Sequence, residues 1–163
     1  MLVELTVNGE WKSADCPPET TLLKFLREHL MLTGAKLGCD VGDCGTCTVI
    51  VDGESYNSCL MLAARAAGRD VTTIEGLADS QGVHPIQEAF EELGSLQCGF
   101  CGPGMIMSAK NLLDKNPTAS RHEIKDALSG NLCRCTGYTK IIEAIEGAGR
   151  IMSSDKYSQS NTF

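Results

Sequence analysis

The N-terminal half of the chain alternates between apolar and polar side chains with the period of two that is typical of β-strands. Two sequences with strong turn signals, Asn8-Gly9 and Asp52-Gly53, interrupt this alternation and predict two β-hairpins. Between them, an apolar stripe over residues 22–30 predicts one helix, capped by Thr20 or Thr21. The expected strands cover residues 2–7, 10–14, 46–51, 54–57 and 71–74. One helix packed across a small mixed sheet would make an α+β domain.

The second half changes to the period of amphipathic helices, after a linker over residues 75–82 that is rich in turn-forming residues. The expected helices cover residues 84–94, 103–115, 121–129 and 139–148. A capping box, Ser120 with Glu123, marks the start of the third helix. Four short helices with short connections predict a small four-helix bundle. We therefore expect one domain over residues 1–78, a second over residues 79–153, and a flexible tail over residues 154–163.

Composition limits the classes of function that the chain can serve. The formal net charge of −7 argues against nucleic acid as a partner, because phosphate binding needs a basic surface. The sequence has no apolar run long enough to span a membrane, so no direct membrane span is expected. Residues 1–7 read as a strand and lack the features of a signal peptide, which favours a cytoplasmic location.

Cysteine is unusually frequent, with nine residues in the chain. Disulfides are disfavoured in the cytosol, so clustered cysteines indicate metal or redox chemistry there. Eight of the nine fall into two groups of four, and Cys16 stands alone beside two prolines. We interpret Cys16 as structurally incidental and the two groups as candidate metal sites.

The first group has the spacing C-x4-C-x2-C with a distant fourth cysteine, which is the pattern of a plant-type [2Fe–2S] cluster. Its members are Cys39, Cys44, Cys47 and Cys59. Gly42 and Gly45 lie inside the loop, where backbone must wrap closely around a cluster and adopt unusual angles. A structural zinc site prefers paired C-x2-C knuckles and fits this spacing less well. Zinc and unrelated free thiols are the alternatives.

The second group is divided between two loops. Cys98 and Cys101 lie between the first and second expected helices, and Cys133 and Cys135 lie between the third and fourth. Antiparallel packing would bring both loops to one end of the bundle. Zinc is a stronger alternative here, because C-x2-C is a zinc knuckle, although the second pair is too tight for one. Arg134, between two of these cysteines, would raise the reduction potential of a negatively charged cluster, or is a plain surface residue.

Three runs carry a resemblance to a known family: Gly38–Cys47, Gln97–Cys101 and Gly130–Tyr138. They resemble the small iron–sulfur subunit of molybdenum hydroxylases. That family includes xanthine dehydrogenases, aldehyde oxidoreductases and aerobic carbon monoxide dehydrogenases. The resemblance implies a β-grasp, ferredoxin-like domain followed by a four-helix domain, each holding one [2Fe–2S] cluster. It also implies a large partner subunit with the molybdopterin cofactor and a medium subunit with FAD.

The same resemblance implies roles for single residues. Gln97 and Cys135 would contact the pterin cofactor of the large subunit, and the chain would relay electrons without a substrate site of its own. Thr46 and Gly102 depart from residues common in the family, without affecting a cluster ligand. The alternatives are a free-standing two-cluster ferredoxin, which is an electron carrier without an enzyme partner, and a zinc-stapled interaction protein.

Overall fold

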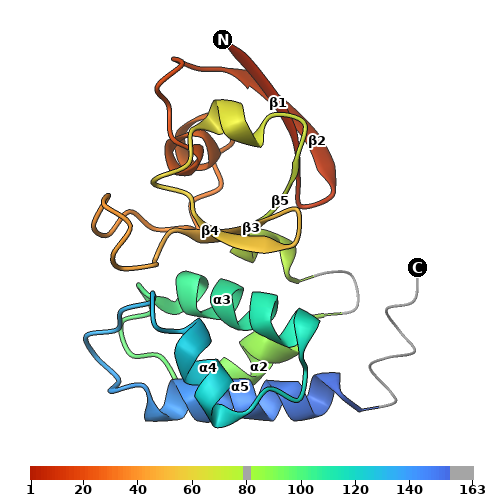
Figure 1. Ribbon diagram of the computed structural model, residues 1–163, viewed down its shortest axis with the longest axis vertical. Coiled ribbons are helices and arrows are strands. Elements are labelled where there is room, and N and C mark those ends of the chain that lie inside the picture. The colour runs from red at the N-terminus through yellow and green to blue at the C-terminus, as the bar shows by residue number, and fades with distance from the viewer. Residues whose placement is uncertain (79–81, 155–163) are drawn as a thin grey trace.

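The computed structural model describes residues 1–78 and 82–154. Part of the expected linker, residues 79–81, and nearly all of the expected tail, residues 155–163, lie outside the described residues. The strands are β1 Leu2–Val7, β2 Glu10–Asp15, β3 Thr48–Val51, β4 Glu54–Asn57 and β5 Asp70–Thr72. The α-helices are α1 Leu22–Lys24, α2 Pro85–Glu92, α3 Gly102–Lys115, α4 Arg121–Ala127 and α5 Thr139–Met152. We call residues 1–78 the sheet half and residues 82–154 the helical half; Figure 1 shows one above the other.

The sheet half contains one five-stranded mixed sheet, with the strand order β2-β1-β5-β3-β4. The two expected hairpins, β1–β2 and β3–β4, form its two sides as antiparallel pairs. Strand β5 lies between them, parallel to β1 and antiparallel to β3. In β1 the alternation predicted from the sequence is present, because Val3, Leu5 and Val7 are buried in the core under the sheet. The chain therefore has the expected α+β fold class.

The helix between the hairpins differs from its expected regular form. Thr21 caps α1, as expected, by accepting a hydrogen bond from the backbone N–H of Lys24. After one turn the chain continues as a π-helical turn over Phe25–His29, where the N–H of Leu30 donates to the carbonyl of Phe25. Met31, with a φ of +59°, then ends the helix. The wider turn still directs Phe25 into the core, where it is fully buried.

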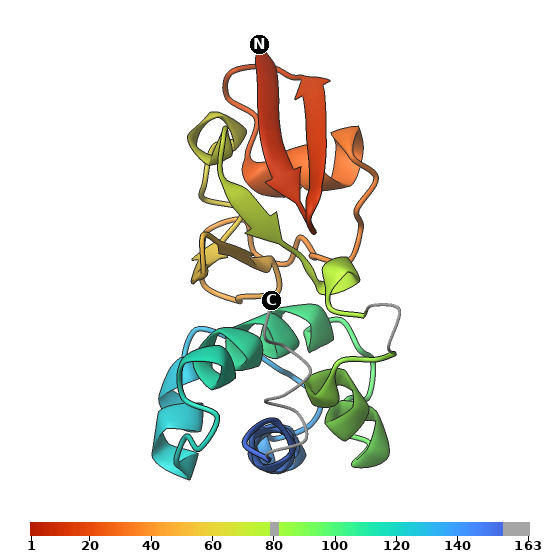
Figure 2. The ribbon, with the colours of Figure 1, turned by 90° about the vertical axis from the view of Figure 1, so that its right-hand side faces the viewer.

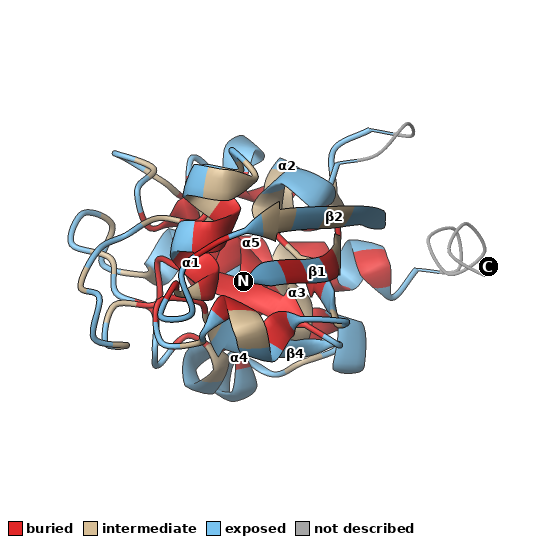
Figure 3. Ribbon diagram, turned by 90° about the horizontal axis from the view of Figure 1, so that it is seen from above, coloured by how far each residue is buried: buried red, intermediate tan, exposed pale blue. Residues whose placement is uncertain are grey.

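The helical half has helices at the four expected places, and α5 extends four residues further than expected, to Met152. Helix α5 packs against α2 and α4, and Figure 2 shows it end-on between them. Helix α3 lies above these helices and packs on β3 and β4 of the sheet half. Seen from above in Figure 3, the ribbon of buried residues lies toward the middle of the molecule, and these residues form two hydrophobic cores, one mainly in each half.

Strand β3 is the structural link between the halves. All four of its residues are buried, because both of its faces are covered. Val49 and Val51 belong to the core under the sheet, whereas Ile50 belongs to the core of the helical half.

In the described part of the chain, no helix is both long and apolar enough to cross a membrane.

Candidate metal centres

The first group of cysteines comes together beside the sheet. The loop before β3 supplies three thiols, and Cys59 returns the fourth from the turn after β4. Asn57 Nδ2 donates to the carbonyl of Gly42 at 2.9 Å, and Ser58 Oγ donates to the carbonyl of Cys47 at 2.6 Å. These bonds fix the turn after β4 against the loop. Gly42 and Gly45 have φ values of +85° and +68°, so the positions predicted to need unusual backbone angles do have them.

Within this site the thiols are arranged as two pairs. The thiol of Cys44 helps to lower the pKa of Cys39, and the thiol of Cys47 helps to raise the pKa of Cys59, so each of these thiols acts on its neighbour. Cys47 and Cys59 are buried, whereas Cys39 and Cys44 are partly exposed. The site therefore has an inner pair that faces the protein and an outer pair nearer to solvent.

Three backbone N–H groups point at the sulfur of Cys39. Cys39 Sγ accepts hydrogen bonds from the N–H groups of Val41, Asp43 and Cys44, at 3.3 to 3.5 Å. The N–H groups of Val41 and then Cys44 lower the pKa of the Cys39 thiol to about 7. Burial, with a further contribution from Cys47, raises the pKa of Cys59 to about 12. Cys39 is thus already suited to the thiolate form, whereas Cys59 needs a positive metal to stabilise its thiolate.

The second group comes together from the loops predicted to meet at one end of the helices. Cys98 Sγ and Cys135 Sγ are 3.6 Å apart, and the thiol of Cys133 contributes to the raised pKa of Cys101. Cys98 and Cys135 are exposed, Cys133 is half-buried and Cys101 is buried at the start of α3. This site also consists of an outer and an inner pair.

The thiols of the second site have shifted pKa values for similar reasons. The N–H of Phe100 lowers the pKa of Cys98, and the thiol of Cys98 raises that of Cys135. Burial raises the pKa of Cys101 to about 12. Burial also acts to raise the pKa of Cys133, but hydrogen bonds from Thr136 and from the backbone N–H of Cys135 outweigh it and lower the pKa.

Glycines leave the space that a cluster and its loops require. A Cβ atom at Gly38 would lie 2.8 Å from Cys44 Sγ, inside the first site. A Cβ at Gly104, in the first turn of α3, would collide with the carbonyl of Gly45. One at Gly45 would collide with the carbonyl of Gly130. Side chains at these positions would push the two cysteine loops apart, so only glycine allows the observed approach.

The two sites are directly connected through the backbone. The N–H of Leu132, next to Cys133, donates to the carbonyl of Cys44 at 2.9 Å. Asn131, which is 5% exposed, donates from Nδ2 to the carbonyl of Gly45 at 3.0 Å and accepts from Ser108 Oγ at 2.7 Å. Asn131 and Leu132, which precede Cys133 of the second site, are therefore hydrogen-bonded to Gly45 and Cys44 of the first site.

Each site presents four cysteine thiols, a donor set that suits a [2Fe–2S] cluster. A structural zinc would need four donors around one point. A [2Fe–2S] cluster takes four thiolates shared between two irons, which matches two pairs of thiols in each site. The residues present therefore fit such a cluster in both places.

The remaining residues singled out in the sequence have simpler surroundings. Gln97 Nε2 donates to the carbonyl of Cys135 at 3.1 Å and so joins the two loops at the exposed edge of the second site. Arg134 is exposed, and Cys16 is buried in the sheet half. The pattern of cysteines did not point to Asn131, Thr136 or Tyr138, which position the second site. They lie close to Cys133 and Cys135 in the sequence, and this proximity was the signal that could have identified them.

Comparison with known proteins matches each half of the chain to a family of iron–sulfur domains. Residues 5–77 match the family described as 2Fe-2S iron-sulfur cluster binding domain, and residues 73–146 match the [2Fe-2S] binding domain family. The chain is 48% identical to the nicotine 6-hydroxylase small subunit of Paenarthrobacter nicotinovorans, over 88% of this chain and 86% of that protein. It is also 48% identical to the nicotinate dehydrogenase small FeS subunit of Eubacterium barkeri, over 90% of this chain and 93% of that protein.

Solved structures give the same result for the whole architecture. The chain superposes on a chain of quinoline 2-oxidoreductase from Pseudomonas putida 86 with a TM-score of 0.90 and 42% identity. That match covers 93% of this chain and 94% of the other. The aldehyde oxidoreductase from Desulfovibrio gigas superposes with a TM-score of 0.90 and 40% identity, over all of this chain but only 18% of that longer one.

Proposed function

Because this chain belongs to the family of small iron–sulfur subunits of molybdenum hydroxylases, we propose that it relays electrons within such a complex through two [2Fe–2S] clusters. The first cluster is held by Cys39, Cys44, Cys47 and Cys59. The second is held by Cys98, Cys101, Cys133 and Cys135. The pairing of thiols within each site is the observation that carries this proposal.

Each half is proposed to be the domain that holds one cluster. Residues 1–78 form a β-grasp, ferredoxin-like domain and residues 79–153 a four-helix domain, followed by a tail over residues 154–163. The mixed sheet with β5 between two hairpins supports the first assignment, and the packing of α2 and α4 on α5 supports the second.

The chain's own contribution is to hold and separate the clusters. Bound [2Fe–2S] clusters accept and release single electrons, which is chemistry that no side chain of this protein supplies. The thiolates hold the irons, and the N–H groups of Val41, Asp43 and Cys44 offset negative charge at the first site. The hydrogen bonds from Leu132 and Asn131 keep the two sites at a constant separation.

The exposed edge of the second site is where we propose that electrons enter. Gln97 and Cys135 contact the pterin of the molybdenum cofactor in a large subunit, as the sequence resemblance implies. Gln97 already lies against Cys135, and the apolar side chains of Phe100 and Leu132 are 46% and 55% exposed beside the same loops. Exposed apolar side chains grouped around a functional site are typical of a protein–protein interface.

Electrons leave through the first site toward a medium subunit that carries FAD, or toward another acceptor. The aldehyde oxidoreductase match, in which this chain corresponds to 18% of a longer chain, supports a large catalytic partner. We place the complex in the cytoplasm, where thiols are kept reduced. The substrate pocket belongs to the large subunit.

Metal analysis of the isolated chain and of the complex tests this proposal. Two clusters require about four irons and about four acid-labile sulfides per chain. About two irons per chain in fully loaded protein, or stoichiometric zinc, would contradict it. Full stability and no binding when the chain is mixed with the large subunit would favour a free-standing two-cluster ferredoxin instead.

A further inference from the structure

Each candidate cluster site has one threonine hydroxyl next to a cysteine sulfur. Thr46 Oγ1 lies 3.3 Å from Cys44 Sγ in the first site, and Thr136 Oγ1 lies 3.2 Å from Cys133 Sγ in the second. The two cysteines lie close in the fold, because the N–H of Leu132, the residue before Cys133, donates to the carbonyl of Cys44. A metal-bound thiolate has no proton, so only the hydroxyl can be the donor in such a contact.

The proton of Thr46 is already engaged elsewhere. Thr46 is 4% exposed, and its Oγ1 donates to the backbone carbonyl of Lys36 at 3.1 Å. A carbonyl oxygen can only accept, so this bond uses the single proton of the hydroxyl. Towards Cys44, Thr46 therefore presents an oxygen lone pair and not a donor.

The proton of Thr136 is in the opposite situation. Its Oγ1 accepts a hydrogen bond from the backbone N–H of Tyr138 at 3.3 Å, which leaves the hydroxyl proton unused. Within residues 1–78 and 82–154, Cys133 Sγ is the acceptor that this hydroxyl meets. Because Thr136 Oγ1 already accepts from the N–H of Tyr138, its own proton is directed to Cys133 Sγ.

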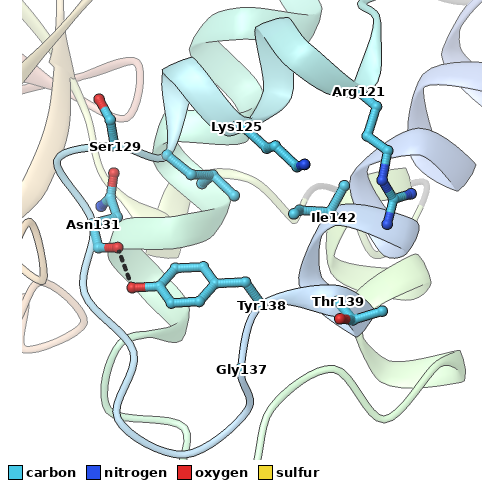
Figure 4. A pocket seen from close by; sticks show the side chains of 9 residues that line it. Arg121, Lys125, Ser129, Asn131, Gly137, Tyr138, Thr139 and Ile142 are labelled. Atoms are coloured by element: carbon cyan, nitrogen blue, oxygen red, sulfur yellow. Dashed lines mark hydrogen bonds between the residues drawn. The ribbon is translucent and has the colours of Figure 1, made fainter.

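Tyr138 keeps this arrangement in place. It adopts the left-handed conformation, with a φ of +71°, at the position before α5. Its hydroxyl accepts from the N–H of Cys133 at 2.9 Å and donates to the carbonyl of Asn131 at 3.0 Å, the bond drawn in Figure 4. The loop from Asn131 to Tyr138 is thereby closed on itself, which holds the backbone N–H of Tyr138 where it donates to Thr136 Oγ1.

We propose that Thr136 donates a hydrogen bond to the Cys133 thiolate and raises the reduction potential of the second cluster, whereas Thr46 gives no such bond to the first. This inference rests on the proposed function, since it presumes a cluster in each site. A hydrogen bond to a ligand sulfur stabilises the more negative, reduced form, and such bonds are among the factors that set cluster potentials. Thr136 acts through Cys133 and is therefore a positioning residue.

Redox titration of the assembled complex, followed by EPR of both clusters, tests this assignment. Thr136→Val keeps the shape of the side chain and removes the donor. At a fixed ambient potential it should reduce the ratio of reduced to oxidised second cluster by roughly threefold to tenfold, because the bond exists in both oxidation states and only the difference in its strength between them shifts this ratio. Thr136→Ser, which retains the hydroxyl, should restore most of the wild-type value.

Thr46→Val is the matched control, and it should leave the potential of the first cluster unchanged. An unchanged second cluster in Thr136→Val, or an equal shift of the first cluster in Thr46→Val, would overturn the inference. If Thr136→Val does not retain the second cluster, Thr136→Ala repeats the test without the bulk of valine. Loss of the cluster in both variants would show a purely structural role and would also overturn it. Absence of both EPR signals in the wild-type complex would instead refute the proposed function.

Discussion

The two cysteine sites have the same set of donors but opposite relations to their surroundings. Both sites bury an inner thiol, but in the first site even the outer thiols, Cys39 and Cys44, are half-buried. In the second site, two loops at helix ends leave Cys98 and Cys135 exposed. The first site is therefore covered more fully by the protein around it, whereas the second is open on the side where we propose that a large subunit binds. This difference is the reason why we propose the exposed edge of the second site as the interface with the catalytic partner.

The strongest test of this comparison removes one site and asks whether the other survives. Cys59→Ala removes a buried thiolate from the first site, and we expect that site to lose its cluster, since ligation and folding are coupled there. Iron per chain should fall by about half, to about two, while the EPR signal of the second cluster remains.

Cys16→Ala is the control for that experiment, because Cys16 is buried at 5% exposure but belongs to neither group. It should keep both clusters. Loss of both signals in Cys59→Ala would show that the halves do not hold their clusters separately.

A second prediction concerns the two cores. Leu26 in the sheet half and Ile145 in the helical half are each fully buried. Replacement of either by alanine should lower the free energy of unfolding by about 2–5 kcal/mol. On heating, Leu26→Ala should lower the temperature at which the first cluster is lost more than that of the second, and Ile145→Ala should do the reverse. Simultaneous loss in both variants would mean that the halves unfold as one unit.

A third prediction concerns the contact between the halves. Asn131→Ala removes the bonds to Gly45 and Ser108 and leaves buried polar groups without partners. We expect a loss of about 1–3 kcal/mol in urea unfolding. Asn111, which also reaches across to the sheet half by donating to the carbonyl of Gly53 at 2.7 Å, is less buried and is the matched control. An equal cost for Asn111→Ala would contradict a special role for Asn131.

The smallest effect should be on stability in acid. A hydrogen bond from Arg69 lowers the pKa of Asp52 in the sheet half, and one from Ser120 lowers the pKa of Glu123 in the helical half. Lowered carboxyl pKa values stabilise the fold above the unfolded values of about 4, and this contribution is lost as the pH falls below them.

Asp52→Asn and Glu123→Gln should therefore each make the fall in unfolding temperature between about pH 5 and about pH 3 slightly smaller. A steeper fall in either variant would contradict the assigned sign. Gln can still accept in the capping box, so Glu123→Gln should change little at pH 7.

Much of this architecture could be predicted from local sequence signals. Turn pairs, the Ser120 capping box and helical periodicity located the hairpins and helices, because these features depend on neighbouring residues. The π-helical turn after α1 and the insertion of β5 between the hairpins depend on long-range packing, which periodicity does not report. The grouping of the eight cysteines followed from spacing, but the pairing within each group depends on how separate loops meet. The contacts of Asn131 with Gly45 join positions 86 residues apart, so no local pattern could have revealed them.

The order of the relay is the central claim, and one measurement tests it most directly. Rapid-freeze EPR would be recorded on an assembled complex that carries Cys59→Ala and so lacks only the first cluster. We predict that substrate still reduces the second cluster, while electrons no longer reach the external acceptor. If molybdenum is reduced but the second cluster stays oxidised, electrons do not enter through the Cys98–Cys135 edge, and the account is contradicted.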